Sequence, residues 1–538
     1  MKFSVFAAFL IATSITAGVV AGCGGNGSSD ADVPPDIRAV MNQARYAGAS
    51  WGLRVVDAQT GATVLDMQPD RSFYVGSVRK LFSVGELLDQ VGPSHRYNTP
   101  VYRQGTVSAG VLAGDLVLVA SGDLTMGGRT NPDGSIAISD YDHNEANTLG
   151  NAVLTQPDPL AGYRSLAQQV AAAGITHVSG DVVIDDRLFQ PFPYRGEFDL
   201  RPIFVNDNMI DLTIKPTAPG QAASLDWRPK SAALNVDNAL TTGAAGTELG
   251  FELAPWFSSC IGSAGCTTRV NGAIPIDFKP QFTRQFPLVK SIRITRPDNY
   301  ARTVFIEALQ AAGVTVDAVA VKENPVHLLP QRDSWQNAAK VAELPGLPYA
   351  DYAKLILKVS YNLGADTSML LWGKTQGVDS MAATLAVEQA HLASRYGVPS
   401  NEYAFFNGSG GGDTQAVTRA VTQFLAQMRK SAHFDTYFDA LPILGTDGSL
   451  AFVKDYAADP SLAGATGQVR AKTGTNIGAT DAGLLLKGQA FGGYIRTKSG
   501  RDLNYVLVVN NAPVADIDAV AQVFQDEGTI SAILWRDY

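Results

Sequence analysis

The chain is short of cysteine, histidine and basic charge, and these shortages exclude several classes of protein. Its 538 residues include three Cys and six His, and no His stands in an H-E-x-x-H or similar metal-ligand pattern. A Walker loop, a G-x-G-x-x-G turn after a strand and a G-x-S-x-G nucleophile elbow are also absent. The net charge of −9 offers no basic surplus for nucleic acid as a partner. If the protein is an enzyme, we expect it to work without a metal, a nucleotide, another cofactor or a catalytic His.

Long apolar runs are scarce as well, and only the N-terminus carries one. This run extends from Phe3 to Val20 after a single Lys, as in the core of a secretory signal peptide. It ends in Val-Ala-Gly-Cys, which resembles a bacterial lipobox, and a Gly/Ser-rich tether follows. We therefore predict a signal peptide over residues 1–22, a lipid on Cys23 and a tether over 23–35. The mature protein would be exported to the cell envelope and anchored on the extracytoplasmic face of a bacterial membrane. The alternative is an ordinary secretory signal with an incidental Cys.

The two remaining cysteines, Cys260 and Cys266, lie in the segment SSCIGSAGCTT. Five residues separate them, among them Gly and Ser, which favour turns. In an exported protein such a pair is expected to close a small disulfide loop. A metal site would need further Cys or His nearby, and this segment has none. We predict that the pair is structural.

Strand and helix patterns indicate one domain that is interrupted by a long insertion. With 46% apolar and 17% charged residues, the composition is that of a globular protein, and its length allows two or more domains. Helical periodicity flanks a middle part in which short strands prevail, from about residue 97 to 290. Residues 127–158 are rich in Asn, Asp and Gly but lack the D-x-D-x-D-G spacing of calcium ligands. We expect this segment to be a solvated surface loop.

Three short motifs are candidates for chemistry: Ser77-Val-Arg-Lys80, Ser360-Tyr-Asn362 and Lys472-Thr-Gly474. Each is short enough to occur by chance, and the first alone fits an ordinary helix start with a solvated Lys. Their order and contexts carry more weight. The first opens a predicted helix after a hairpin, the second lies in a helical region, and the third precedes Gly-rich sequence and a strand pair. The set resembles the serine penicillin-recognising enzymes, in which S-x-x-K, S-x-N and K-T-G line one cleft.

A narrower resemblance follows from the length of chain between the motifs. Ser77 and Ser360 are 283 positions apart, more than a simple β-lactamase-like domain needs. The chain is similar to the D-alanyl-D-alanine carboxypeptidase/endopeptidases of the penicillin-binding protein 4 type, which carry a large insertion at this point. Segments that match the family, in the family's order, run from about residue 50 to 511: ASGDLTMG, VSGDVVIDDRLF, VSYNLGADT, FNGSGGG, LPILGTDGSL, VRAKTGT and GYIRTKSGR.

The resemblance implies the fold class and the division into domains. The fold would be α/β (α+β), with a β-lactamase/transpeptidase-like domain in which helices cover both sides of an antiparallel sheet. That catalytic domain would comprise residues 36–96 and 336–538. A strand-rich insertion of one or two subdomains would occupy 97–335, with an outer subdomain at roughly 121–190.

The chemistry of a Ser-Lys pair can be argued from the residues themselves. A serine hydroxyl is a poor nucleophile and needs a base. Positions i and i+3 share one face of a helix, so Lys80 can reach the Ser77 hydroxyl. A Lys is a base only when its ammonium form is destabilised, and partial burial together with the nearby cation of Lys472 would lower the pKa of Lys80.

The remaining roles are implied by the resemblance. Ser360 would relay the proton to the leaving amine, and Asn362 would orient Lys80 and the substrate amide. The substrate would be a peptidoglycan stem peptide, and β-lactam antibiotics would be covalent inhibitors. Further residues would bind the substrate. Lys472 and Thr473 would bind its terminal carboxylate, Gly474 would leave space for it along the strand edge, and Asp185 would bind the amine of the diamino acid. The backbone N–H groups of Ser77 and Thr475 would bind the oxyanion. The alternative for Asp185 is a turn residue at the end of a strand.

The chain departs from the family at Tyr361, where the family often has Asp, and we expect altered cleft contacts there. Ser409 in FNGSGGG is expected to shape a turn.

A β-lactamase or an esterase of the same fold is an alternative function, although the E-x-x-L-N segment of class A β-lactamases is absent. A non-catalytic wall-binding homologue is a third possibility, but it would have no need of the intact Ser77, Lys80 and Lys472.

Overall fold

The computed structural model describes residues 33–538, apart from 255–256, 259, 261–263, 281, 333, 336–337 and 481–482. The predicted signal peptide, Cys23 and most of the tether lie outside these residues. Among the described residues, no helix has both the length and the apolar character needed to cross a membrane.

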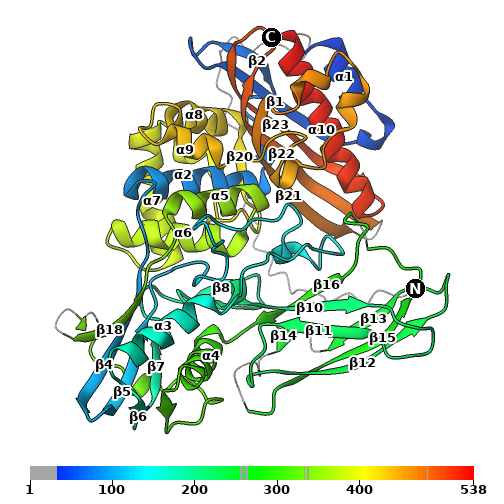
Figure 1. Ribbon diagram of the computed structural model, residues 1–538. Helices are drawn as coiled ribbons and strands as arrows, with labels where there is room; N and C mark the ends of the chain where they lie inside the picture. Colours follow the sequence, from blue (N-terminus) through cyan, green and yellow to red (C-terminus); the bar gives the residue numbers. More distant parts are fainter. Residues whose placement is uncertain are drawn as a thin grey trace, which may run out of the picture.

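The two ends of the chain build one antiparallel sheet of five strands, in the order β2-β1-β23-β22-β21 (Figure 1). A hairpin near the N-terminus supplies β1 (Ser50–Asp57) and β2 (Thr63–Met67), and the C-terminal part supplies the other three strands. β1 lies beside β23, with Trp51 opposite Val509. The C-terminal strands are β21 (Val469–Thr480), β22 (Gly483–Arg496) and β23 (Asp502–Val514).

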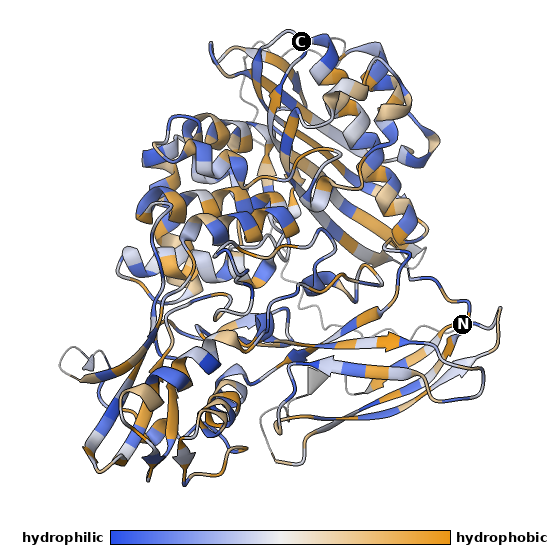
Figure 2. Ribbon diagram, viewed as in Figure 1, coloured by the Kyte–Doolittle hydropathy of each residue, from blue (hydrophilic) through white to orange (hydrophobic). Residues whose placement is uncertain are grey.

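Helices cover both faces of this sheet because its strands are apolar on both sides. Along β23, Tyr505 and Leu507 belong to the core shared with the C-terminal helix α10 (Ile517–Asp537), whereas Val506 and Val508 belong to the core shared with α8 (Thr418–Met428). This is the two-residue period of a strand that is buried on both faces. The apolar residues along the sheet and its helices are visible in Figure 2.

A group of helices packs beside the sheet and holds its catalytic edge. Its centre is formed by α2 (Lys80–Val91) and α6 (Asn362–Thr375), whose residues 80–88 and 362–373 are buried on all sides. Because both helices are enclosed, side chains at their first residues are fixed by packing. The other helices of this group are α5 (Tyr349–Val359), α7 (Met381–Tyr396) and α9 (Phe434–Asp439).

The inserted region begins with β4 (Thr99–Ser108) and ends with β18 (Ala339–Leu344), and these two strands pair with each other. The return to the catalytic part therefore comes after Leu344, and not at residue 336 as predicted. The predicted outer subdomain at 121–190 differs as well, because β7 (Val182–Asp185) pairs with β5 (Val111–Val119) in the sheet that contains β4.

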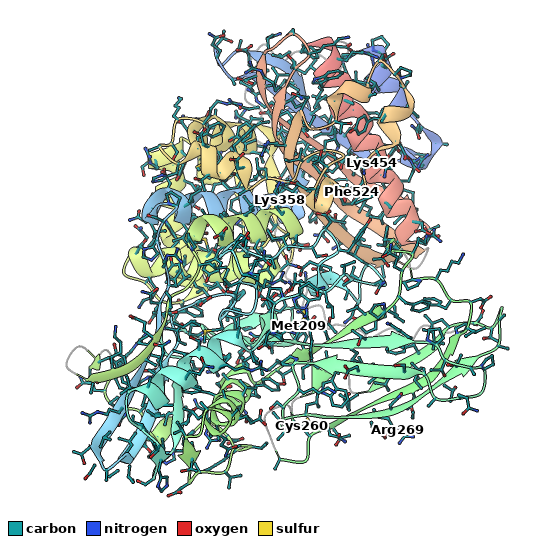
Figure 3. The ribbon with its side chains drawn as sticks, viewed as in Figure 1. Met209, Cys260, Arg269, Lys358, Lys454 and Phe524 are labelled. Carbon is teal, nitrogen blue, oxygen red and sulfur yellow. A yellow bond between two sulfur atoms is a disulfide. The ribbon has the colours of Figure 1, made fainter. Side chains whose placement is uncertain are left out.

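A second part of the inserted region consists of two further sheets. One contains β11 (Ser224–Arg228), β10 (Met209–Lys215), β16 (Leu288–Ile294) and β14 (Phe257–Ser258), and the other contains β12 (Asn235–Gly243), β15 (Thr267–Pro275) and β13 (Gly250–Ala254). Cys260 and Cys266 form a disulfide in this part, with Cα atoms 5.3 Å apart (Figure 3).

The inserted helices α3 (Ala161–Ala172) and α4 (Pro297–Ala311) cover the sheet that contains β4. The remaining short strands are β3 (Ser72–Tyr74), β6 (His177–Val178), β8 (Phe192–Tyr194), β9 (Phe198–Leu200), β17 (Thr315–Val316), β19 (Tyr403–Ala404) and β20 (Gln415–Val417), and a short helix α1 (Pro35–Met41) begins the described chain.

Residues 127–158 are not a solvated loop, contrary to the prediction. They lie between the catalytic sheet and the inserted strands, in cyan in Figure 1, and Arg129, Asp142, His143 and Asn151 are buried. The segment is polar because its buried side chains form ion pairs and hydrogen bonds with one another and with the inserted strands, so its composition resembled that of a surface loop. We refer to it below as the excursion.

Candidate active site

Ser77 lies in one 3₁₀ turn (Gly76–Arg79) that leads directly into α2, whose first residue is Lys80. The two side chains face each other, with Lys80 Nζ 2.6 Å from Ser77 Oγ. Lys80 Nζ also donates to Asn362 Oδ1 at 2.6 Å and to the carbonyl oxygen of Ser409 at 2.8 Å. An ammonium group has three donors, so all three are directed at named acceptors and the amine is held in one position.

Burial lowers the pKa of Lys80 to about 7, against the opposing charges of Asp366 and Glu145. A fully buried ammonium loses its hydration, and this loss favours the neutral amine. The same loss lowers the pKa of Lys472, and the positive charge of Lys80 lowers it further. The sequence had suggested burial together with the cation of Lys472 as the causes of a low pKa at Lys80. Burial is the main cause, and the cation that lowers this pKa further is Arg195.

Ser360 ends α5 in the left-handed conformation, with φ 62° and ψ 38°. A non-glycine residue in this region is strained and persists only where the surroundings hold it. Here α5 and α6 meet around Ser360, and its Oγ accepts a hydrogen bond from Lys472 Nζ at 2.9 Å. Two residues later, Asn362 opens α6 and contacts Lys80. The S-x-N motif thus spans the gap between the two lysines.

The edge strand β21 carries Lys472 and Thr473 along the cleft. Thr473 Oγ1 donates to Ser449 Oγ at 2.8 Å, and Thr475 Oγ1 donates to Gln489 Oε1 at 2.7 Å. Gly474 lies where the turn that carries Ser77 packs on the strand, because a Cβ there would lie 2.0 Å from the carbonyl oxygen of Val75. The Gly474 position therefore gives room to the nucleophile's own turn, whereas the resemblance had implied room for the substrate.

Glu145 of the excursion contacts the catalytic motifs, and sequence reasoning missed it. Its Oε1 accepts a hydrogen bond from Asn362 Nδ2 at 3.0 Å and lies 3.6 Å from the Arg195 guanidinium. Asn362 thereby uses its oxygen for Lys80 and its amide nitrogen for Glu145. No motif or spacing distinguished Glu145 from the many other polar residues of the excursion.

Asp366 is a second buried group that the sequence analysis did not identify. It stands one turn after Asn362 on α6, and its carboxylate accepts from the backbone N–H of Ser409 at 2.8 Å and from the Ser409 hydroxyl at 3.1 Å. This pair fixes the turn whose carbonyl oxygen accepts from Lys80, so Ser409 shapes a turn. Burial raises the pKa of Asp366 to about 6, and the charge of Lys80 opposes this shift. The spacing of four residues after Asn362 on one helix was the signal that could have revealed it.

A network of buried ion pairs fastens the excursion close to Glu145. His143 Nδ1 lies 2.8 Å from Asp211 Oδ1, and its Nε2 lies 2.7 Å from Asp207 Oδ2. Arg129 donates to Asp207 at 2.8 Å and to Asp142 at 2.8 Å. Within the described residues, Asp142, His143 and Asp207 are the one group close enough to hold a metal ion. Since Arg129 pairs with both carboxylates and His143, whose pKa is raised to about 9, supplies a second positive charge, the group is accounted for as an internal salt-bridge network.

Two residues that the sequence singled out do not reach the cleft. Asp185 is buried, and its carboxylate accepts two hydrogen bonds from the Arg187 side chain, at 2.7 and 2.8 Å, and one from Trp335 Nε1 at 3.1 Å. Its partners are those of a strand-end residue, and it is absent from the cavity walls next to Ser77. The ring of Tyr361 lies in the hydrophobic core, so the expected change in cleft contacts at this position is wrong.

Two cavities meet at Ser77, Asn362 and Thr475. One, of about 310 Å³, extends over Ser409, the glycines 410–412 and the segment 192–195 that contains Arg195. The other, of about 350 Å³, extends over Ser360, Thr473 and Ser449 towards the excursion and the start of α10. The Ser77 hydroxyl lies next to an amine of lowered pKa, which suits nucleophilic attack. Because it also lies where two cavities meet, a bound substrate chain could extend from it into both cavities.

Comparisons with known proteins agree with this geometry. Residues 34–526 match the model of the D-Ala-D-Ala carboxypeptidase 3 (S13) family. A D-alanyl-D-alanine carboxypeptidase of an Actinomadura species is 26% identical over 522 residues, which cover 92% of this chain and 85% of the relative. The crystal structure of penicillin-binding protein 4 from Haemophilus influenzae superposes with a TM-score of 0.66 at 15% identity, over 93% of this chain and 99% of the other. The same protein in complex with a β-lactam gives a TM-score of 0.64 at 17% identity, over 93% and 99% of the two chains.

Proposed function

The chain belongs to this family of D-Ala-D-Ala carboxypeptidases, and we propose that Ser77 is the nucleophile with which it cleaves D-Ala-D-Ala ends. Membership confirms the predicted family resemblance and the serine-type DD-peptidase activity, and the penicillin-binding protein 4 structure confirms the predicted fold class. The enzyme acts on the cell wall, outside the cytoplasm. The observation that carries the proposal is the 2.6 Å contact between Ser77 Oγ and Lys80 Nζ. Lys80 is buried, and its pKa is lowered to about 7.

In the first step, the Ser77 oxygen attacks the carbonyl carbon of the penultimate D-Ala while the neutral amine of Lys80 takes the hydroxyl proton. The carbonyl oxygen becomes an oxyanion, and the backbone N–H groups of Ser77 and Thr475 would stabilise it by about 3 kcal/mol each. The position of Thr475 supports this role, because a Cβ on Gly76 would lie only 2.9 Å from the Thr475 nitrogen.

The intermediate then expels the leaving amine, and the C–N bond breaks. Ser360 relays to this amine the proton that Lys80 took from Ser77, so that Lys80 is neutral again. Lys472, 2.9 Å from Ser360 Oγ, is in contact with the relay. The terminal carboxylate would be received by Thr473, which lines the cavity, and by Lys472, whose buried amine lies behind it and donates to the Thr473 carbonyl oxygen. D-Ala departs and leaves an ester on Ser77. Water then attacks the ester carbonyl while Lys80 takes a proton from the water. The bond between the acyl carbon and Ser77 Oγ breaks, Lys80 returns the proton to Ser77 Oγ, and the acid is released.

The substrate is a peptidoglycan stem peptide that ends in D-Ala-D-Ala, or a D-Ala cross-link between two stems. A β-lactam would form the same ester with Ser77, because its amide carbonyl takes the place of the peptide carbonyl. The β-lactam complex of the related penicillin-binding protein 4 supports this inhibitor class. Trimming of free ends and cleavage of cross-links share one chemistry, so we propose both.

Labelling with a fluorescent penicillin tests the role of Ser77. We expect a long-lived adduct in the wild type and none in Ser77→Ala. Rapid turnover of the drug would favour a β-lactamase, and absence of any adduct would favour a non-catalytic wall-binding homologue. Digestion of purified muropeptides then measures release of D-Ala and loss of cross-linked dimers. Hydrolysis of simple esters without either product would contradict the peptidase and favour an esterase.

The N-terminal segment supports export and a lipid on Cys23, because an apolar run leads into Val-Ala-Gly-Cys and a tether. Export in a bacterial host followed by labelling with a radioactive fatty acid tests this proposal. We expect label in the wild type and none in Cys23→Ala, with the variant released from the membrane fraction. Label that persists in Cys23→Ala would contradict the assignment.

A further inference from the structure

The cavity on the Lys472 side of Ser77 continues well beyond the place of a terminal carboxylate. It has a volume of about 350 Å³, and Ser77, Ser360 and Thr473 line one end of it. Past Ser449 its wall is mainly apolar, with Asp140 and Thr148 beside the apolar side chains. The apolar residues come from three separate parts of the chain: Tyr141 and Leu149 from the excursion, Phe282 from the loop between β15 and β16, and Phe452 and Phe524 from the catalytic part.

Four of these side chains form a continuous row of rings, which we call the aromatic shelf. The ring centroids of Tyr141 and Phe282 are 6.4 Å apart, those of Phe282 and Phe452 are 6.2 Å apart, and those of Phe452 and Phe524 are 5.3 Å apart. All four residues are half-buried, so each leaves part of its apolar surface against the cavity. Phe524 projects from α10 (Figure 3). Apolar surface next to a reaction site favours a ligand group that removes it from water.

Geometry at the leaving residue indicates which group this is. The Cα atom of a leaving D-amino acid carries an amine, a carboxylate, a side chain and a hydrogen. The amine must face Ser77 and Ser360, and the carboxylate must face Lys472 and Thr473. The side chain is the remaining heavy substituent, and the cavity beyond Thr473 and Ser449 is the space that adjoins it. The methyl group of D-Ala is too short to reach a row of four rings.

We infer that the aromatic shelf binds the side chain of the leaving residue when that residue is a D-amino acid with an aliphatic chain of three or more carbons. This inference rests on the proposed function and names a wider class of leaving group for it. The hydrolysis remains the same: the C–N bond breaks, water supplies OH to the acyl group, and the amine gains the proton.

Two matched substrates test the inference: diacetyl-L-Lys-D-Ala-D-Ala and diacetyl-L-Lys-D-Ala-D-norleucine, with the released D-amino acid measured by chromatography. In Phe452→Ala and in Phe282→Ala, we expect the ratio of kcat/KM for norleucine release to that for D-Ala release to fall about tenfold relative to the wild type, as for lost methylene contacts in an apolar pocket. Phe438→Ala on α9 is the matched control, since Phe438 is half-buried but absent from the cavity wall. Its ratio should equal that of the wild type.

The outcomes separate this inference from the proposed function. If Ser77→Ala still released D-Ala, the proposed function would fail. If the wild type releases D-Ala but no D-norleucine, or if both shelf variants keep the wild-type ratio, the inference is overturned while the function stands. A Phe452→Ala protein that no longer forms a penicillin adduct is misfolded. In that case the ratio measured for Phe282→Ala alone decides whether the inference holds. A substrate with L-norleucine at the last position should show no dependence on the shelf residues.

Discussion

Glu145 of the excursion accepts a hydrogen bond from the side-chain amide of Asn362 at 3.0 Å, although 217 positions separate the two residues. The other end of the same amide accepts a hydrogen bond from Lys80. Glu145 therefore determines which end of the Asn362 amide faces Lys80. In this way a residue of the inserted region positions Lys80, the base that we propose for the reaction.

Replacement of Glu145 should change the pH dependence of acylation as well as its rate. The negative charge of Glu145 raises the pKa of Lys80, so removal of that charge lowers this pKa and extends the neutral amine to lower pH. In Glu145→Gln, we expect the acidic limb of the acylation rate to move to lower pH. In Glu145→Ala the amide of Asn362 is released, and we expect a rate loss of about tenfold, typical of a lost positioning hydrogen bond to a charged group. Stopped-flow acylation by a fluorescent penicillin measures both effects, and an unshifted limb in Glu145→Gln would contradict the role.

The base should be active only when Lys80 is neutral. Because burial lowers the pKa of Lys80 to about 7, the acylation rate should rise between pH 5 and a plateau above about pH 7. In Lys80→Arg the side chain stays protonated at every accessible pH, and we expect a loss on the order of 10³-fold. A profile that is flat from pH 5 to 9 in the wild type would rule out Lys80 as the titrating base.

A methyl group on Gly474 should damage both stability and activity. Its Cβ would lie 2.0 Å from the carbonyl oxygen of Val75 and 3.0 Å from the nitrogen of Ser77, so the nucleophile's turn must move away from β21. We expect Gly474→Ala to destabilise the protein by about 1–3 kcal/mol and to abolish penicillin labelling. Gly478→Ala on the same strand is the control, because its Cβ would meet only the flexible end of Lys487, at 3.1 Å. Equal melting temperatures for the two variants would refute the close-packing argument.

The buried His143 should make the inserted region less stable at high pH. Burial alone would lower its pKa, but the carboxylates of Asp211 and Asp207 outweigh burial and raise it from 6.5 to about 9. The folded state therefore holds a proton that the unfolded state releases near pH 6.5. The resulting stabilisation is complete below that pH and is lost as the pH rises through about 9, and it amounts to about 3 kcal/mol.

Melting temperatures of the wild type and of His143→Gln between pH 6 and pH 10 check this prediction. The two temperatures should differ most at pH 6 and converge towards pH 10. His433→Gln is the control for replacement of a histidine as such, because His433 lies outside the network of Arg129, Asp142, Asp207 and Asp211. A constant difference for His143→Gln would show that the residue is neutral in the folded protein.

The sequence was sufficient to identify the family, the fold class and the three motifs, because these depend on short segments whose order is fixed along the chain. Ser77 and Lys80 are three residues apart in one turn, so their contact could be inferred from local geometry. Their link to Ser360 and Lys472 required the resemblance, since no periodicity relates residues that are hundreds of positions apart.

Glu145 and the role of the excursion could not be inferred in this way. The excursion contains polar residues at irregular spacing, and whether such residues face water or one another depends on tertiary contacts with Asp207 and Asp211. For Asp185 a local match to a family strand suggested a substrate contact, with a turn residue as the alternative. In the structure Arg187, two residues later, donates to its carboxylate, a contact that the sequence alone did not indicate. The boundary at residue 336 was drawn before β18 because the pairing of β18 with β4 joins segments more than two hundred residues apart.

Because the excursion lines part of the catalytic cleft, substitutions in it can affect substrate binding without changing the three motifs. The three motifs supply the residues that we propose make and break bonds. The excursion supplies Glu145, which positions them, and also Tyr141 and Leu149, which line the cavity beyond them. Substitutions at Tyr141 and Leu149 are therefore expected to alter which cell-wall linkages are cut, while Glu145 and the proposed antibiotic target, Ser77, are left unchanged. Related bacteria could diverge in wall architecture through this segment and still share the same sensitivity to penicillin.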